Sequence, residues 1–133
     1  MQEIEIPTDQ PIYESAIATY WFEDGILISL SKNVLRTVEL IAENAALVKS
    51  ITNHTPTPLL IFLAKSPVPD KTTRQYSTEV LPQIYSAMAM VSKPGLAQFI
   101  MRLLFALQQP PIPMKSFTDK ASAKQWLLAQ GGR

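Results

Sequence analysis

The side chains that most often carry out catalysis are scarce in this chain of 133 residues. His54 is the only histidine, and there is no cysteine. The sequence therefore offers no thiolate nucleophile, no disulfide and too few nitrogen and sulfur ligands for a typical zinc site. His54 lies in the polar stretch 52–57, which is typical of an exposed loop, so we do not expect it to act as a catalytic base.

Two glutamates, Glu39 and Glu43, stand four residues apart on one face of a predicted helix, where paired carboxylates could do acid and base chemistry. Lys32, Arg36 and Lys49 are close in the sequence and favour a solvated, charge-balanced face instead. The four glycines are scattered and form no phosphate-binding loop. We therefore expect no catalytic residue, no metal and no cofactor, and a protein that is not an enzyme.

The stretch KSPVPDKTTR, residues 65–74, is the best candidate for a ligand site. It follows a predicted central strand, and open α/β sheets bind ligands beyond the carboxyl ends of their strands. Free amides at the start of the next helix, with hydroxyls and cations beside them, could hold a phosphate or carboxylate. The alternative is that Thr72 or Thr73 only caps the helix while the cations stay solvated. The candidate anion-binding residues are Lys65, Lys71, Thr72, Thr73 and Arg74.

The composition excludes several kinds of partner. Twelve basic and 11 acidic residues give a net charge of +1, so there is no basic patch for a nucleic acid. No apolar run approaches the ~20 residues of a membrane span, and the N-terminus lacks the features of a secretory signal, so we expect a cytoplasmic protein. Only 17% of the residues are charged, against ~25% in typical domains. This suggests that something beyond the monomer covers part of the surface.

Hydrophobic periodicity and turn signals predict a single domain, residues 13–130, after an extended lead-in, residues 1–12. The pair Asp24-Gly25 between two β-rich runs predicts an antiparallel hairpin. The predicted strands are 16–22, 26–31, 58–64, 87–91 and 114–117. The predicted helices are 37–50 with Thr37 as its cap, 72–84 with a kink or early end at Pro82, 92–107 and 119–129. This order implies an α/β fold, a mixed five-stranded sheet flanked by about four helices.

Several blocks of the sequence are similar to those of STAS-like domains, also called anti-sigma-factor-antagonist-like domains. The blocks are EDGILISLSK, PLLIFLAKS, TTRQYS, AMAMVSKPGLAQFIMRLLFAL and PPIPMKSFTDKASAKQWL. The resemblance spans about residues 15–129 and implies the fold and a non-enzymatic, regulatory role with a protein partner. In the phosphorylatable members of the superfamily that these blocks resemble, an aspartate lies on the central strand and a serine pair lies at the start of the next helix. Here Ile61-Phe62-Leu63-Ala64 and Thr72-Thr73 stand instead, so the residues of that switch are missing.

The predicted third helix, GLAQFIMRLLFAL, is apolar almost all round. A sheet covers only one face of a helix, so the other face needs a second copy, another protein, a lipid or the proline-rich segment 109–113. We expect a homodimer, with Phe99, Met101 and Phe105 as candidate interface residues. The alternative function is a carrier or sensor of a small anionic or lipid-like ligand, bound between the second and third helices.

An extended segment that contains Pro110, Pro111 and Pro113 precedes the last predicted strand and helix. We expect Phe117 to enter the core and Thr118 or Asp119 to cap the last helix. Ala123, Trp126 and Leu127 are spaced to form the inward face of this helix, with Trp126 as its largest buried anchor.

Overall fold

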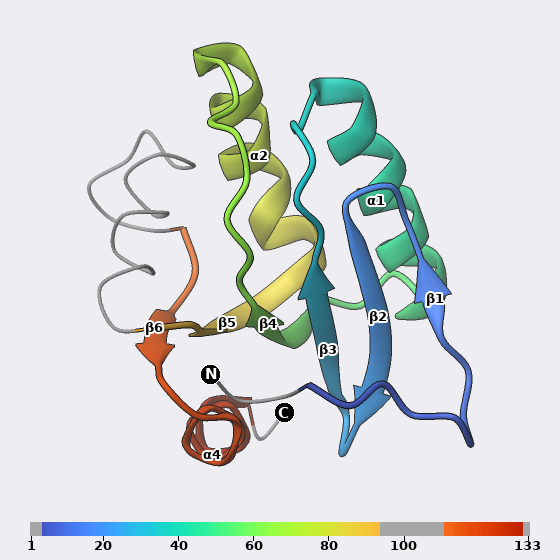
Figure 1. Ribbon diagram of the computed structural model, residues 1–133, viewed down its shortest axis with the longest axis vertical. Helices are drawn as coiled ribbons and strands as arrows, with labels where there is room; N and C mark the ends of the chain where they lie inside the picture. Colours follow the sequence, from blue (N-terminus) through green and yellow to red (C-terminus); the bar gives the residue numbers. More distant parts are fainter. Residues whose placement is uncertain (1–3, 94–110, 132–133) are drawn as a thin grey trace.

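The computed structural model describes residues 4–93 and 111–131 of the chain. Its six-stranded sheet has the strands in the same order as in the sequence (Figure 1). The first three strands pair antiparallel and the third to the sixth pair parallel. The strands are β1 (Tyr13–Glu14), β2 (Ala18–Glu23), β3 (Ile26–Ser31), β4 (Thr57–Phe62), β5 (Tyr85–Val91) and β6 (Met114–Phe117). The predicted mixed sheet is confirmed. The additional strand, β1, is too short to show an alternating pattern in the sequence.

The hairpin between β2 and β3 is confirmed, and its turn explains the Asp-Gly pair. Asp24 has φ 53° and Gly25 has φ 78°. A two-residue turn with both φ values positive matches the right-handed twist of the flanking strands, and aspartate and glycine tolerate these values best. The turn therefore fixes the register in which Tyr20 lies opposite Ser29.

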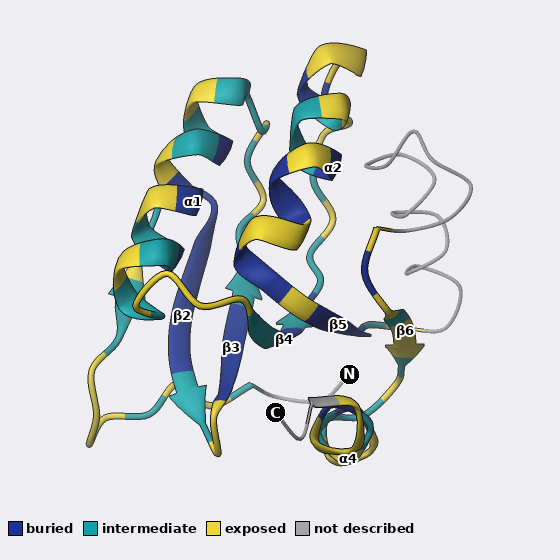
Figure 2. Ribbon diagram, turned by 180° about the vertical axis from the view of Figure 1, so that it is seen from behind, coloured by how far each residue is buried: buried dark blue, intermediate teal, exposed yellow. Residues whose placement is uncertain are grey.

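Two helices, α1 (Val38–Ile51) and α2 (Lys71–Ile84), lie on one face of the sheet, and α4 (Lys120–Gly131) lies on the other (Figures 1 and 2). The predicted cap of α1 is confirmed, because the Thr37 hydroxyl accepts from the N–H of Leu40 at 3.1 Å. Asp119 caps α4 through its Oδ1, which accepts from the N–H of Ser122 at 2.8 Å. The predicted third helix lies outside the described residues.

The early end expected at Pro82 is not seen, because α2 continues to Ile84. Pro82 lacks an amide hydrogen and so cannot donate to the preceding turn. It stands only two residues before the helix ends, so few helical residues follow the lost bond. Val80, Leu81 and Ile84 are buried on the inward face of α2, whereas Tyr76 is only half-buried.

The sheet separates two apolar clusters. Leu59 of β4 belongs to the cluster under α1 and α2, whereas Leu60 and Phe62 belong to the cluster under α4. Apolar residues therefore cover this strand on both faces, as an uninterrupted apolar run favours. On β5 the methionines Met88 and Met90 face α1 and α2, and three smaller residues, Ala87, Ala89 and Val91, face α4.

The prediction that Trp126 is the buried anchor of the last helix is wrong. Ala123 and Leu127 are completely buried, whereas Trp126 is half-buried and its ring lies 5.9 Å from that of Phe117, which is also only half-buried. The physical reason is that α4 presents a narrow row of residues to the sheet, and Trp126 lies beside this row next to the edge strand β6. The fully buried tryptophan is Trp21 on β2.

Residues 4–12 have no regular secondary structure and contribute to the cluster under α4. Ile4 and Ile12 pack against this cluster. The Gln10 side chain donates to the carbonyl of Phe22 at 2.8 Å, which ties the segment to the hairpin. These contacts help to shelter the face of β2 and β3 that carries Trp21 and Ile28.

Candidate functional site

A cavity of about 140 Å³ lies between α1, α2 and the sheet. Tyr20, Ser29 and Ile61 form one row across β2, β3 and β4, and all three line it. The next positions along these strands, Ser31 and Leu63, also line it, so the cavity extends toward the carboxyl ends of β3 and β4. The other apolar wall residues are Ile17, Ala18, Ile41, Leu59, Ala64, Pro69, Val80, Leu81, Ile84 and Met88.

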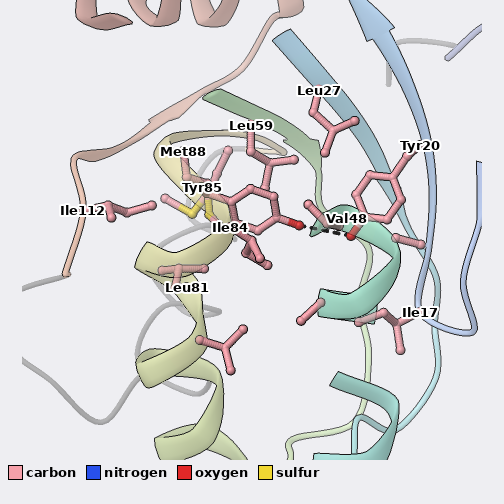
Figure 3. Packing of buried hydrophobic residues seen from close by; sticks show 14 residues of the cluster. Ile17, Tyr20, Leu27, Val48, Leu59, Leu81, Ile84, Tyr85, Met88 and Ile112 are labelled. Carbon is pink, nitrogen blue, oxygen red and sulfur yellow. Dashed lines mark hydrogen bonds between the residues drawn. The ribbon is translucent and has the colours of Figure 1, made fainter. Parts of the chain in front are cut away.

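Two buried tyrosines place a polar cluster in this apolar setting. Tyr20 and Tyr85 point toward one another, with their hydroxyl oxygens 3.1 Å apart (Figure 3). The Tyr20 hydroxyl donates to Asn44 Oδ1 at 2.9 Å, and the Ser15 hydroxyl donates to the same oxygen at 2.7 Å. Because a phenol has one hydrogen, Tyr85 must then be the donor to Tyr20. The cluster joins β2, β5 and α1 across the cavity.

Both phenols are neutral at ordinary pH. Burial raises the pKa of Tyr20 above its usual value, and its hydrogen bonds to Tyr85 and Asn44 only partly offset this effect. Burial also raises the pKa of Tyr85, well above its usual value, and the neighbouring Tyr20 adds to the rise. Neither tyrosine can therefore act as a phenolate near neutral pH, and both serve as hydrogen-bonding groups.

Arg36 lines the cavity from the connection between β3 and α1. Its Nη1 donates to the carbonyls of Lys32 at 2.6 Å and Val34 at 2.8 Å. Its Nη2 donates to the carbonyl of Ile17 at 3.1 Å and to the Ser31 hydroxyl at 2.8 Å. Burial lowers the pKa of Arg36 from its ordinary value, but a guanidinium remains charged near neutral pH.

The charge of Arg36 has no carboxylate partner among residues 4–93 and 111–131. The ion pairs there are Lys32 with Glu14, Lys120 with Glu23, and Lys124 with both Glu23 and Asp24. Within the cavity wall, as far as the structure describes it, Arg36 is the only ionised side chain at neutral pH. A positive charge in a largely apolar cavity is the main electrostatic feature of the site.

The sequence contains a partial indication of this cavity, in polar residues on otherwise apolar faces. Ser29 and Ser31 alternate with apolar residues along the second predicted strand and make one of its faces mixed. Asn44 lies in the apolar stripe of α1 beside Ile41 and Ala45, and all three are buried. A serine pair and an asparagine directed at a core face indicate buried polar contacts, but the sequence does not reveal that they surround a space.

The predicted anion site is arranged differently from the expectation. Asp70, and not Thr72 or Thr73, caps α2, because its Oδ1 accepts from the N–H of Thr73 at 2.8 Å. This bond lowers the pKa of Asp70, so its carboxylate already supplies a negative charge at the helix start. Arg74 donates to the carbonyl of Pro69 at 2.8 Å.

The five candidate residues do not share one environment. Thr73 is buried, Arg74 is half-buried, Lys71 and Thr72 are exposed, and Lys65 lies on the preceding connection. None of these five lines the described cavity wall, although Ser66 and Pro69 from the same stretch do. An anion site at Lys65 and residues 71–74 stays a prediction, and the capping carboxylate of Asp70 weakens it.

Other predictions concern residues or features away from the cavity. His54 is exposed in the connection after α1, as expected of a loop histidine. The candidate interface residues Phe99, Met101 and Phe105 lie outside the described residues. No described helix is long and apolar enough to cross a membrane. In the same part of the chain, no three histidine, cysteine, aspartate or glutamate side chains gather as a metal site would require.

The comparisons with known proteins identify a fold and a family but no activity. The model of the family described as "Domain of unknown function (DUF7793)" matches residues 20–130. A solved structure of an uncharacterized protein from the DUF3478 family of Shewanella loihica PV-4, with a SpoIIAA-like fold, is similar with a TM-score of 0.56 and 20% sequence identity. The similarity covers 88% of this chain and 90% of that one. No curated protein matches the chain. The fold is therefore SpoIIAA-like, that is, STAS-like, as the sequence blocks implied.

Proposed function

The chain belongs to the DUF7793 family, and we propose that it is a non-enzymatic, STAS-like regulatory domain that binds a small molecule. The cavity between α1, α2 and the sheet carries this proposal. It combines apolar walls with a few convergent polar groups, which is the usual make-up of a small-molecule site. The described residues that line it offer hydrogen bonds and one charge, and none of these described residues is a base poised beside a nucleophile.

The size of the cavity supports a use beyond packing. Protein interiors contain few voids larger than a water molecule. The cavity is partly open, so a small molecule can reach its apolar walls from solvent. A bound molecule of matching size would supply the contacts that these walls lack.

The experiment is a titration of the labelled protein with benzyl alcohol and with benzoate, followed by amide chemical shifts. We expect saturable shifts at residues of the cavity wall, such as Ser29 and Tyr85, with at least one of the two probes. Ser77→Leu adds an apolar side chain at a cavity-lining position of α2 and should abolish binding. Gln75→Leu makes a similar change at an exposed position of the same helix and should leave binding intact. Absence of saturable binding by both probes would refute the proposed function.

A second candidate function is contact with another protein, with a second copy of the chain as the first partner to consider. The observation in its favour is the sequence of residues 96–107, where only Gln98 and Arg102 interrupt the apolar residues. Phe99, Met101 and Phe105 are the side chains proposed for this interface.

We assign the domain to the cytoplasm in the same proposal, because a cysteine-free chain suits a reducing compartment.

A further inference from the structure

We infer that the ligand of the cavity is a small monoanion with a compact apolar body, such as an aromatic or short branched carboxylate. Arg36 supplies both the opposite charge and a hydrogen-bond donor, its Nε–H. This inference rests on the proposed function, because it names the class of molecule that the same cavity takes. It is carried by three observations: the unbalanced charge, the hydrogen-bond donor that remains available, and the volume.

The charge of Arg36 favours an anion. Its guanidinium is partly buried, and its four hydrogen bonds end on carbonyl and hydroxyl oxygens, which are neutral acceptors. No carboxylate of the described residues pairs with it, and no acidic side chain lines the described wall. A charge removed from water without a counter-charge is unfavourable, so an incoming carboxylate gains more here than at a solvated arginine.

The available donor also favours an acceptor on the ligand. The four hydrogen bonds of Arg36 use its Nη1 and Nη2 hydrogens, so its Nε–H remains. The hydrogens of Tyr20 and Tyr85 are used within the polar cluster. Asn44 is engaged in the same cluster, because its Oδ1 accepts from Ser15 and Tyr20 and its side chain also lowers the pKa of Tyr85. These hydrogen-bonding groups favour a ligand with a negatively charged acceptor group over a ligand that donates hydrogen bonds.

The volume limits the rest of the molecule. Apolar cavities of about 150 Å³ bind molecules of the size of benzene, and this cavity measures about 140 Å³. Leucine, isoleucine and valine side chains form much of its wall, so the body of the ligand should be apolar and compact. A long acyl chain exceeds the volume of this cavity. The lipid-like ligand predicted from the sequence concerns a different place, between the second and third predicted helices, and stays a prediction.

Arg36 also holds the connection between β3 and α1 in place, so removing it would test folding and binding together. Ser31→Asp avoids this difficulty, because Ser31 Oγ already accepts from Arg36 at 2.8 Å. The new carboxylate would neutralise the guanidinium from within the protein and leave its carbonyl bonds in place. Ser31→Asn is the matched control, since it has nearly the same shape and no charge.

The measurement is the Kd of benzoate and of benzyl alcohol at pH 7 and low salt, by calorimetry or chemical shift. In the native chain, benzoate should bind at least tenfold more tightly than benzyl alcohol, and added salt should reduce the difference. Ser31→Asn and Ser31→Asp have nearly the same side-chain shape, so a comparison of the benzoate preference between these two variants isolates the effect of the charge. In Ser31→Asp this preference should disappear or reverse, while benzyl alcohol still binds.

Two outcomes would overturn the inference without touching the proposed function: equal binding of the two probes by the native chain, or the same benzoate preference in Ser31→Asp and Ser31→Asn. Failure of both probes to bind the native chain would remove the proposed function and the inference together.

Discussion

The two tryptophans of the chain lie in different environments. Trp21 is 0% exposed and belongs to the cluster between the sheet and α4. Its indole N–H donates to Glu23 Oε2 at 2.9 Å, so its polar atom is satisfied. Trp126 is half-buried against Phe117. The free energy that each ring contributes should follow this difference.

We predict that Trp21→Ala lowers the free energy of unfolding by about 3–5 kcal/mol, because it leaves a large cavity in the core. Trp126→Ala should cost about 1–2 kcal/mol, because much of its ring surface is already in contact with water. Denaturant unfolding of both variants, monitored by circular dichroism, measures the two losses. A loss at Trp126 as large as that at Trp21 would contradict the burial described above.

Single residues also show where sequence reasoning was limited. The helical period places Trp126 on the same side of α4 as Ala123 and Leu127, but it does not say how wide the covered stripe is. The buried hydrogen bonds of Asn44 could not be predicted either. Asn44 lies within an apolar stripe, and the two hydroxyls that donate to it belong to residues 24 and 29 positions away in the sequence. Contacts between residues so far apart depend on how the helices pack on the sheet.

The β2–β3 hairpin and α4 are distant in the sequence and are joined by four charged side chains, two acidic and two basic. Glu23 Oε2 accepts from Lys120 at 2.9 Å, and Glu23 Oε1 accepts from Lys124 at 3.3 Å. Lys124 also contacts Asp24 at 2.8 Å. Burial acts to raise the pKa of Glu23, but its bonds with Lys120, Trp21 and Lys124 together lower it.

We predict that Glu23→Gln lowers the free energy of unfolding at pH 7 by about 1 kcal/mol. Since the folded-state pKa of Glu23 is lowered, its contribution is complete above its unfolded value of about 4.3 and is lost as the pH falls through the folded value. The difference between native and variant chains should therefore vanish in acid. Urea unfolding at a series of pH values measures it.

Glu39→Gln is the matched control for this prediction. Glu39 is exposed in the first turn of α1 and makes no ion pair within the described residues. It should change the stability by less than about 0.5 kcal/mol. A pH-independent loss in Glu23→Gln would mean that side-chain shape, and not charge, matters at this position.

Element boundaries could be predicted where a local signal controls them. Asp24-Gly25 specifies its turn by backbone conformation, and Thr37 caps α1 by a bond three residues along the chain. The start of α2 was misplaced, because Asp70, Thr72 and Thr73 are all good caps and the choice depends on the path of the preceding prolines. The strand β1 has only its pairing with β2 to define it.

For the whole molecule, self-association is the proposal that residues 96–107 support by their sequence. We predict that light scattering on the purified chain gives twice the monomer mass of 14.8 kDa. Phe105→Glu should shift the protein to a monomer, because it places a charge in an apolar interface. Leu128→Glu is the control, since Leu128 is exposed on α4. A monomeric native chain would contradict the homodimer.

The fold class was predictable because runs of apolar residues, turns and caps are local, and their order leaves few arrangements. The mixed sheet follows from that order, whereas the STAS-like architecture was implied by the resemblance of several sequence blocks. The cavity was not predictable, because its volume depends on the separation of α1 from α2 above β3 and β4. The described residues that surround it come from several separate stretches of the chain, and no motif unites them.

The strand order has a consequence for how the protein is made. Each strand of the sheet lies beside the one synthesised before it. The hairpin can therefore form as soon as residue 31 has left the ribosome. Each later strand can then pair with the edge strand that was synthesised before it. Among the described elements, α4 comes last in the chain and reaches back to the first hairpin, where Lys120 contacts Glu23 and Lys124 contacts Asp24.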